Sequence, residues 1–186
     1  MAEDFMSTQV IHSVTLVLLR GNIVEVQADA IVNAANSALA GGSGVDGAIH
    51  QAGGPSIMAE CNKLNGCPTG SAVATTAGRL KARYVFHAVG PVYRGRDEDA
   101  RLLASAYQTC LTLAEERKLK SIAFPSISTG VYGYPIDKAA PIALKTVIEH
   151  IKQPTSLQQV MFVLFGSDAY AAYKHALAQL VSDVEA

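Results

Sequence analysis

AIVNAAN at residues 30–36, followed by LAGGSGVDGAIH at residues 39–50, is the stretch of sequence that decides the fold. The short apolar run at its start is typical of a buried strand, and its glycine-rich loop leads into a segment with helical spacing. Glycine lets the backbone come close to a ligand, and the free N–H groups at the start of a helix attract anions. We therefore expect a strand, a loop and a helix that together bind a phosphate-bearing ligand.

The other apolar runs extend this arrangement along the chain. They are short and rich in β-branched or aromatic residues, which is typical of strands buried on both faces of a sheet. A weaker candidate at residues 71–76 alternates small polar with apolar residues. Besides residues 30–32, the stronger predicted strands cover residues 14–19, 84–89, 122–124 and 160–165.

Segments with helical spacing lie between the later strands. Apolar residues recur every three or four positions from Leu103 to Ala114 and from Ala140 to Ile151, and Ser167 is a suitable N-cap for a last helix. Strands that alternate with helices predict a three-layer α/β/α domain with a mostly parallel, mixed central sheet. Ligands of such folds bind beyond the carboxyl ends of the strands.

Composition limits what the chain can be. Its residues are 49% hydrophobic and 17% charged, which predicts one domain over residues 1–186 that folds as a monomer. Residues 1–10 are expected to form a flexible N-terminal extension. The 15 Lys and Arg nearly balance the 16 Asp and Glu, so no broad basic field is present for nucleic acid or anionic lipid. A bound anion must be held by local geometry.

The cysteines and the first residues predict the compartment. Cys61, Cys67 and Cys110 form no CxxC pair and lack the His spacing of a zinc site, so we expect free thiols and no metal. Acidic residues open the chain where a secretory signal would carry basic ones, and no apolar run is long enough to span a membrane. These features favour a cytoplasmic protein.

A second loop of small residues, PSISTGVYGYP at residues 125–135, follows the strand predicted at residues 122–124. Two such loops at neighbouring strand ends would hold a diphosphate from both sides through backbone N–H groups, without a cluster of Lys or Arg. The alternative is a tight structural turn in which Tyr132 and Tyr134 only cover the core. For this segment alone, the two interpretations have about equal support.

The glycine loop also matches a dinucleotide-binding pattern, because residues 42–47 read GxGxxG. Two features disfavour that site. A long polar loop separates these glycines from the strand, and Asp46 would place a carboxylate inside the phosphate turn. No Walker A sequence occurs either. A dehydrogenase and an NTPase are therefore disfavoured.

Asp46 and His50 are spaced i and i+4, so they share one face of a helix that begins near Val45. The alternative is that Asp46 caps the helix and His50 forms a hydrogen bond inside the core. The neighbouring glycine loop favours a joint functional role for the pair.

These stretches resemble the MacroD-type macrodomains, a family that binds ADP-ribose. The resemblance is carried by residues 33–36, 41–50 and 128–135. It extends from about residue 15 to about residue 180 and includes CPTG at residues 67–70 and HAVGP at residues 87–91. It implies the α/β/α macrodomain fold and a cleft for ADP-ribose.

The resemblance also implies roles for individual residues. Asn36 would bind the distal ribose hydroxyls, Asp46 would orient or activate the attacking water, and His50 would support them. Residues 41–45 would surround the distal ribose and a phosphate, while residues 128–132 would hold the diphosphate. The expected ligand-binding residues are Asn22, Ile23, Gly41, Gly42, Ser43, Gly44, Val45, Ser128, Thr129, Gly130, Val131, Tyr132 and Phe165.

Two of these positions concern the adenosine end. Phe165 matches a position where the family often places an aromatic ring against adenosine, and the alternative is an ordinary core Phe. After the first strand the family usually has Gly-Asp-Ile, whose Asp accepts a hydrogen bond from the adenine amino group, whereas this chain has Asn22. An Asn oxygen still accepts that bond, but a neutral hydrogen bond is weaker than a charged one.

The family's reaction is attack of water on an ester of the distal ribose, without metal or cofactor. It releases ADP-ribose from mono-ADP-ribosylated Asp or Glu of proteins, or acetate from O-acetyl-ADP-ribose. A carboxylate near a helix N-terminus is a weak base alone, so a ligand phosphate would assist Asp46. The alternatives are a non-catalytic ADP-ribose reader, an ADP-ribose 1''-phosphate phosphatase and, with little support from the balanced charge, an RNA-binding module.

Overall fold

The computed structural model describes residues 4–185, and its seven strands form one mixed sheet in the order β1-β2-β7-β6-β3-β5-β4. The four inner pairs, from β2–β7 to β3–β5, are parallel, and the two edge pairs are antiparallel. The predicted mostly parallel, mixed sheet is confirmed. The strands are β1 (Met6–Ile11), β2 (Val14–Arg20), β3 (Ala30–Ala34), β4 (Ala72–Thr76), β5 (Tyr84–Ala88), β6 (Ser121–Phe124) and β7 (Gln159–Leu164).

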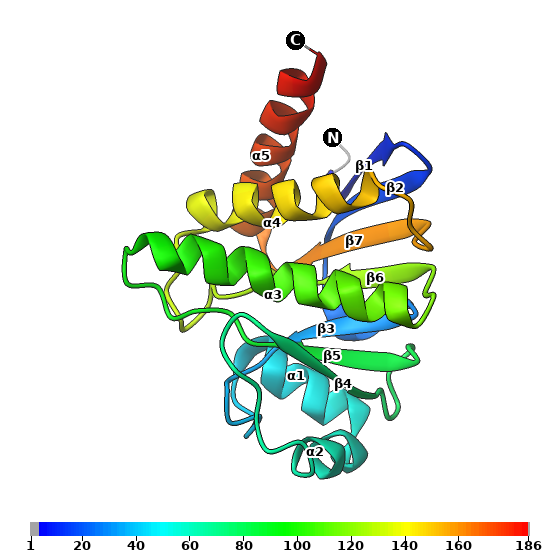
Figure 1. Cartoon of the computed structure of the whole chain (residues 1–186), viewed down its shortest axis with the longest axis vertical. Coiled ribbons are helices and arrows are strands. Elements are labelled where there is room, and N and C mark those ends of the chain that lie inside the picture. Colours follow the sequence, from blue (N-terminus) through cyan, green and yellow to red (C-terminus); the bar gives the residue numbers. More distant parts are fainter. Residues whose placement is uncertain (1–3, 186) are drawn as a thin grey trace.

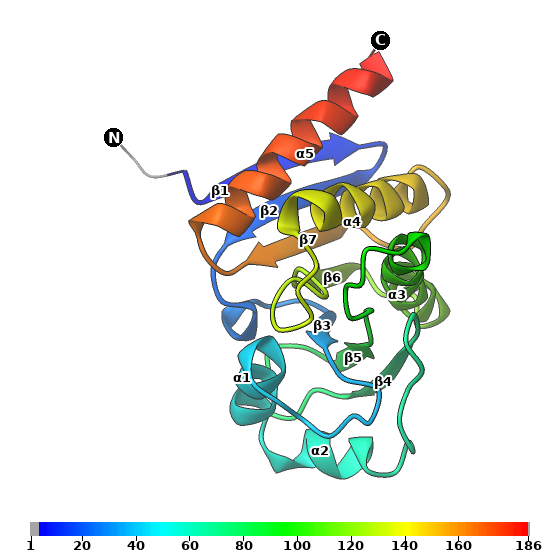
Figure 2. The same ribbon diagram turned by 90° about the vertical axis from the view of Figure 1, so that its left-hand side faces the viewer.

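Helices cover both faces of this sheet, so the three-layer prediction is also confirmed (Figures 1 and 2). Successive strand residues point to opposite faces. In β3, Ile31 packs in the core layer beneath α1 and α2, while Val32 packs in the layer beneath α3, α4 and α5. The helices are α1 (Gly44–Gly53), α2 (Pro55–Cys61), α3 (Asp97–Glu116), α4 (Ile136–Ile151) and α5 (Ser167–Glu185), with a 3-10 turn η1 (Ile23–Glu25).

The N-terminal segment corrects one expectation. Residues 6–10 belong to β1, which pairs antiparallel with β2 along its whole length, so their assignment to a flexible extension is wrong. β1 is an edge strand that exposes every second residue, and it therefore lacks the apolar run by which the inner strands were predicted. Residues 1–3 lie outside the described residues. The short helix α2 was not predicted either.

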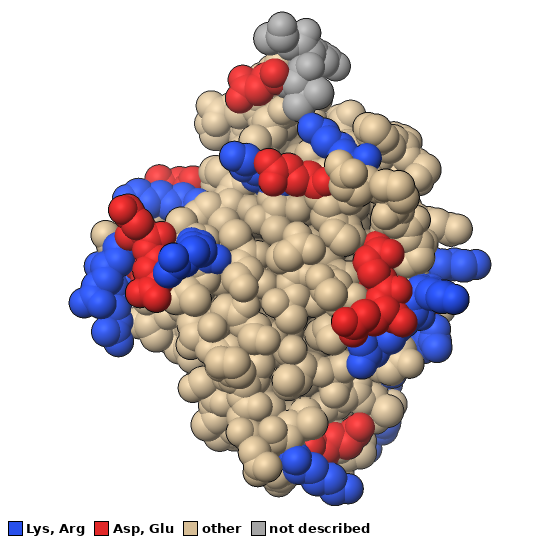
Figure 3. Space-filling view, in the orientation of Figure 1, with Lys and Arg blue, Asp and Glu red and all other residues tan. Residues whose placement is uncertain are grey.

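The surface agrees with the balanced charge of the sequence. On the face seen in Figure 3, Lys and Arg side chains lie beside Asp and Glu at the margins, and a broad central area carries neither sign. Among residues 4–185, no helix combines the length and the apolar character needed to cross a membrane.

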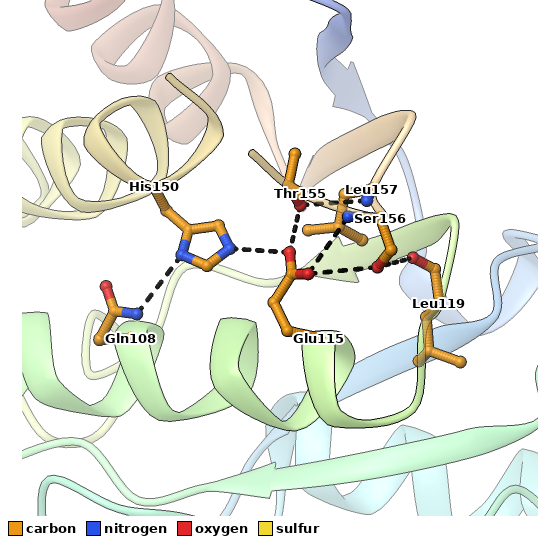
Figure 4. Close-up of polar contacts among 7 residues, drawn as sticks. All are labelled: Gln108, Glu115, Leu119, His150, Thr155, Ser156 and Leu157. Atoms are coloured by element: carbon orange, nitrogen blue, oxygen red, sulfur yellow. Dashed lines mark hydrogen bonds and ion pairs between the residues drawn. The ribbon is translucent and has the colours of Figure 1, made fainter. Parts of the chain in front are cut away.

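The half-buried carboxylate of Glu115 joins α3, α4 and the loop between α4 and β7 (Figure 4). Glu115 accepts hydrogen bonds from His150 Nε2 at 3.0 Å, from the Thr155 hydroxyl and from the backbone N–H of Ser156 at 3.2 Å. Burial alone would raise the pKa of this carboxyl, but the hydrogen bonds from Thr155 and His150 outweigh it and lower the pKa. Glu115 therefore fastens the end of α3 to the loop that follows α4.

Glu115→Gln is expected to lower the free energy of unfolding by about 1.5 to 3 kcal/mol at pH 7, because a charged acceptor is replaced by a neutral one. The folded pKa lies below the ordinary value of 4.5, so this contribution is complete above pH 4.5 and is lost as the pH falls through the folded pKa. Urea unfolding at pH 7 and at a series of lower pH values measures both effects. Exposed Glu116→Gln is the control, and an equal loss in both variants would contradict the prediction.

Candidate functional site

The candidate site is a cleft of about 270 Å³ at the carboxyl ends of β3, β5 and β6. These three strands are neighbours in the sheet, so the segments that follow them meet at one edge. Residues of both predicted loops line the cleft. Its lining residues are Ala34, Ala35, Asn36, Gly42, Ser43, Gly44, Val45, Asp46, Gly90, Ser126, Ile127, Ser128, Gly130, Val131 and Tyr132.

The first loop is shaped by Asn36. Its Nδ2 donates to the Gly41 carbonyl at 2.9 Å, and its Oδ1 accepts from the Ala40 N–H at 3.1 Å. Each group keeps one further hydrogen or lone pair that can reach a ligand. The loop ends at Ser43, which begins α1 without a side-chain cap among the described residues. The N–H groups in the first turn of α1 are therefore available to an anion.

The second loop is anchored by buried tyrosines. Tyr107 accepts from the Ile127 N–H at 2.9 Å and donates to the Pro125 carbonyl at 3.2 Å, while Tyr173 donates to Ser126 Oγ at 3.0 Å. Beyond this anchor, within the described residues 4–185, the N–H groups of residues 129–132 donate to no protein acceptor. A run of free N–H groups beside a cleft is suited to bind phosphate oxygens.

Ser128 is the strained residue of this loop. It has a positive φ of 68°, a conformation that is uncommon for residues other than glycine. Its side chain is buried, and its hydroxyl has no hydrogen-bond partner among the described residues. Gly90 lies directly against it, because a Cβ at Gly90 would lie 2.2 Å from Ser128 Oγ and 2.5 Å from Ile127 Cγ2. The side chains of Ser128 and Ile127 occupy this place only because residue 90 has no side chain.

Among the described residues, Asp46 is the one carboxylate in the lining, and its side chain is nearly buried. Oδ1 accepts a hydrogen bond from Asn33 Nδ2 at 2.8 Å and lies 3.3 Å from His50 Nε2. Oδ2 lies on the side of Gly42, where a Cβ would approach it to 3.4 Å. The interpretation of Asp46 as a helix cap is wrong, since α1 has no side-chain cap. Its predicted pairing with His50 is confirmed.

A buried polar network behind Asp46 was missed by sequence reasoning. Asn33 Nδ2 also lies 3.1 Å from His87 Nδ1, and His87 Nε2 lies 2.9 Å from Thr75 Oγ1. Asn33, Thr75 and His87 are all buried. Their signal in the sequence was a polar residue inside each of three strands, at positions where the pattern of a buried strand calls for an apolar one.

Comparison with known proteins agrees with this geometry. Residues 32–143, which make up more than half of the chain, match the family described as Macro domain. The chain belongs to the Macro domain family. A protein of Salmonella newport named O-acetyl-ADP-ribose deacetylase is 47% identical over 173 residues, covering 90% of this chain and 97% of that protein.

Two solved macrodomains resemble this macrodomain in structure. The one from Oceanobacillus iheyensis, solved with ADP, has a TM-score of 0.93 and 40% identity over 96% of this chain and 97% of that chain. The one from Trypanosoma brucei, solved in complex with ADP-ribose, has a TM-score of 0.82 and 42% identity over 87% and 68% of the two chains. The family resemblance and the macrodomain fold are confirmed.

The macrodomain also brings a thiol to the network. The candidate ligand atoms of His50, Cys61 and His87 lie within 4.8 Å of one another, a grouping that sequence spacing did not predict. By distance alone these side chains could hold a metal ion. The hydrogen bonds of His87 disfavour metal binding. His87 Nδ1 faces the donor Nδ2 of Asn33 and must accept from it, so the ring proton sits on Nε2. Nε2 then has no lone pair for a metal ion. Burial, with Asp46 and Glu60 nearby, also raises the pKa of the Cys61 thiol.

Six predicted site residues do not line this cleft. Three belong to its surroundings: Gly41 accepts from Asn36, Thr129 donates to the Ser126 carbonyl at 3.1 Å, and His50 contacts Asp46 from behind. The other three, Asn22, Ile23 and Phe165, follow β2 and β7 farther along the same sheet edge.

Phe165 and Asn22 show different surroundings. Phe165 is 83% exposed, so its interpretation as a core residue is wrong and its ring is free to pack against a ligand. Asn22 is the N-cap of η1, and its Oδ1 accepts from the Val24 N–H at 3.2 Å. Ile23 is buried in the core.

Proposed function

We propose that this macrodomain binds ADP-ribose and hydrolyses ADP-ribose esters by attack of water. Its substrates would be mono-ADP-ribosyl groups on Asp and Glu of proteins, and O-acetyl-ADP-ribose. The observation that carries the proposal is the nearly buried carboxylate of Asp46, whose Oδ2 lies toward the glycine loop of a cleft with two sets of free N–H groups. Such a cleft binds a diphosphate without Lys or Arg, and it places one acceptor beside it.

Each part of the cleft has a task in this reaction. The first turn of α1 and residues 129–132 would hold phosphate oxygens through N–H groups. Half-buried Tyr132 would pack over the distal ribose, next to the side chain of Asn36. Asp46 and a ligand phosphate would together orient the water that attacks the ester, so much of the acceleration comes from orientation.

The similar proteins support this proposal. The name of the Salmonella newport relative is that of an enzyme removing an acetyl ester from ADP-ribose, and the Trypanosoma brucei macrodomain holds ADP-ribose itself. A non-catalytic reader would bind the same ligand without turnover. Asp46 favours the enzyme, since binding a dianionic diphosphate gains nothing from a nearby carboxylate.

The decisive experiment combines binding and turnover. Calorimetry measures ADP-ribose affinity, and release of ADP-ribose is followed from a protein mono-ADP-ribosylated on Glu or Asp. Binding with release supports the hydrolase, whereas binding without release would make the macrodomain a reader. Product analysis with ADP-ribose 1''-phosphate and O-acetyl-ADP-ribose separates a phosphatase from an esterase.

Asn22→Asp is expected to tighten ADP-ribose binding about threefold to tenfold. One oxygen of the new carboxylate would replace Oδ1 as acceptor for the Val24 N–H, and the second would offer a charged acceptor to the adenine amino group. Calorimetry with ADP-ribose tests this, and exposed Gln27→Glu controls for the added charge. Equal affinities of wild type and Asn22→Asp would show that adenine is not recognised at this position.

We also propose a single cytoplasmic domain that acts as a monomer and needs no cofactor. One sheet runs through the described residues, and the free cysteines Cys61, Cys67 and Cys110 are all buried. Mono-ADP-ribosylated proteins would be its partners.

A further inference from the structure

The two oxygens of Asp46 have different surroundings. Oδ1 points back into the protein, toward Asn33 Nδ2 at 2.8 Å and His50 Nε2 at 3.3 Å. Oδ2 lies on the side of Gly42, at the cleft. The carboxylate can rotate about its Cβ–Cγ bond unless one oxygen is held, so the contacts at Oδ1, of which the Asn33 bond is the shorter, fix the carboxylate plane and keep the other oxygen directed at the cleft.

Asn33 can hold Asp46 only in one orientation of its own amide. Its oxygen cannot face Asp46 Oδ1 at 2.8 Å, because two acceptors would then oppose each other. The nitrogen therefore faces the carboxylate, and its second hydrogen points to His87 Nδ1 at 3.1 Å. Asn33 Oδ1 is buried without a partner among the described residues, so nothing on that side of the amide fixes it. Its orientation depends on the two acceptors of Nδ2.

His87 can accept from Asn33 only as one tautomer, with its proton on Nε2. That proton has an acceptor in Thr75 Oγ1 at 2.9 Å. Thr75 is free to accept because its own hydroxyl proton goes to the carbonyl of the next residue at 2.9 Å. Donors and acceptors thus alternate without conflict from Thr75 through His87 and Asn33 to Asp46, and every link is buried.

We propose that His87 is a positioning residue for ester hydrolysis, which orients the Asn33 amide and thereby directs Asp46 Oδ2 into the cleft. The inference rests on the proposed function of Asp46. His87 is 1% exposed and is not among the cleft-lining residues, so it would act on the cleft through its contact with Asn33, which in turn holds Asp46.

The charge state of His87 suits this task. Burial, together with the neighbouring His50, lowers its pKa to about 4, so the ring is neutral at physiological pH. A protonated ring would direct an N–H at the N–H of Asn33 and break the alternation. His87 therefore keeps one charge state, and with it one hydrogen-bonding arrangement, at physiological pH.

A pair of isosteric variants tests the proposal. In His87→Asn an amide oxygen takes the place of Nδ1, whereas His87→Leu has the same branched shape and no acceptor. Both variants lose the bond to Thr75. We expect His87→Asn to keep kcat within about threefold and His87→Leu to lose at least about tenfold in kcat, because the misplaced carboxylate no longer orients the water. The Kd for ADP-ribose should stay within about twofold in both.

Several controls make the outcome unambiguous. Exposed His175→Leu on α5 controls for loss of a histidine, and thermal unfolding reports the folded fraction of each variant. Equal kcat values for His87→Asn and His87→Leu, or a loss that appears only in Kd, would overturn the proposal. If His87→Leu does not fold, Thr75→Val replaces it, with a smaller expected loss of kcat and unchanged Kd.

A spectroscopic measurement separates this inference from the proposed function. In wild type, the ¹⁵N chemical shifts of His87 should show a protonated Nε2 and an unprotonated Nδ1. A proton on His87 Nδ1 would overturn the proposed positioning role of His87 even if the protein is an active hydrolase. Failure of wild type to release ADP-ribose, with the expected shifts observed, would instead refute the proposed function and leave the hydrogen-bond order of the network established.

Discussion

Asp46→Asn is expected to lower kcat for ADP-ribose ester hydrolysis by about 100-fold or more, while the Kd for ADP-ribose changes only a few-fold. The asparagine has the same shape, and its oxygen can still accept from Asn33 Nδ2. Its amide nitrogen, however, cannot accept a hydrogen bond or a proton from the attacking water. Single-turnover release of ADP-ribose from a protein modified on Glu, measured beside calorimetric binding, gives both quantities.

Asp137→Asn is the matched control for this substitution. Asp137 is an exposed carboxylate in the first turn of α4 and does not line the cleft, so its variant should resemble wild type. Undiminished turnover by Asp46→Asn would assign activation of the water to a ligand phosphate and contradict the role of Asp46.

Gly90→Ala is expected to weaken ADP-ribose binding by about 100-fold, which corresponds to losing about one strong charge-assisted hydrogen bond. The added Cβ would lie 2.2 Å from Ser128 Oγ and 2.5 Å from Ile127 Cγ2, so these two buried side chains must move, and we expect the second loop to move with them. Movement of this loop displaces the N–H groups of residues 129–132 from the cleft. We also expect a stability loss of about 1 to 3 kcal/mol from overpacking.

Gly21→Ala controls for this experiment, since its Cβ would meet only Leu19 Cγ at 3.9 Å. Calorimetry with ADP-ribose and urea unfolding measure the two effects separately. Unchanged affinity in a folded Gly90→Ala protein would mean that the second loop does not bind the diphosphate.

Both predictions depend on the buried residues that support the cleft from the protein interior. Tyr107 and Tyr173 hold the start of the second loop from the core beneath α3 and α5, and Asn33 holds Asp46 from inside β3. Residues that line the cleft are therefore placed by buried hydrogen bonds to the sheet and its helices. Such sites lose catalytic geometry when a buried partner is changed, even where the cleft surface is intact.

Sequence reasoning was successful where the signal is local. The strand and loop at residues 30–36, the glycines at residues 41–44 and the second loop depend on residues a few positions apart, and the structure places both loops at one cleft. The i, i+4 spacing of Asp46 and His50 belongs to the same class, because a helix fixes which side chains share a face.

The same local rules explain the failures. β1 carries no apolar run, since an edge strand is held by backbone pairing with β2 and not by burial of its side chains. Phe165 is an aromatic residue at the end of an apolar run, which is typical of a strand. β7 nevertheless ends one residue before it, and the ring is exposed. Neither outcome is encoded in the few residues on either side.

The sequence by itself thus determined the inner strands, the longer helices, the two glycine-containing loops and the candidate carboxylate, because periodicity and glycine positions act over short distances. Only the tertiary structure decided that His87 faces Asn33, that the Ser128 side chain packs against Gly90, and that Cys61 lies near His50 and His87. These contacts join different strands, loops and a helix. The contact of His87 with Asn33 exists because the sheet order puts β5 beside β3, and the other two depend on how the loop after β6 and helix α2 pack near β5.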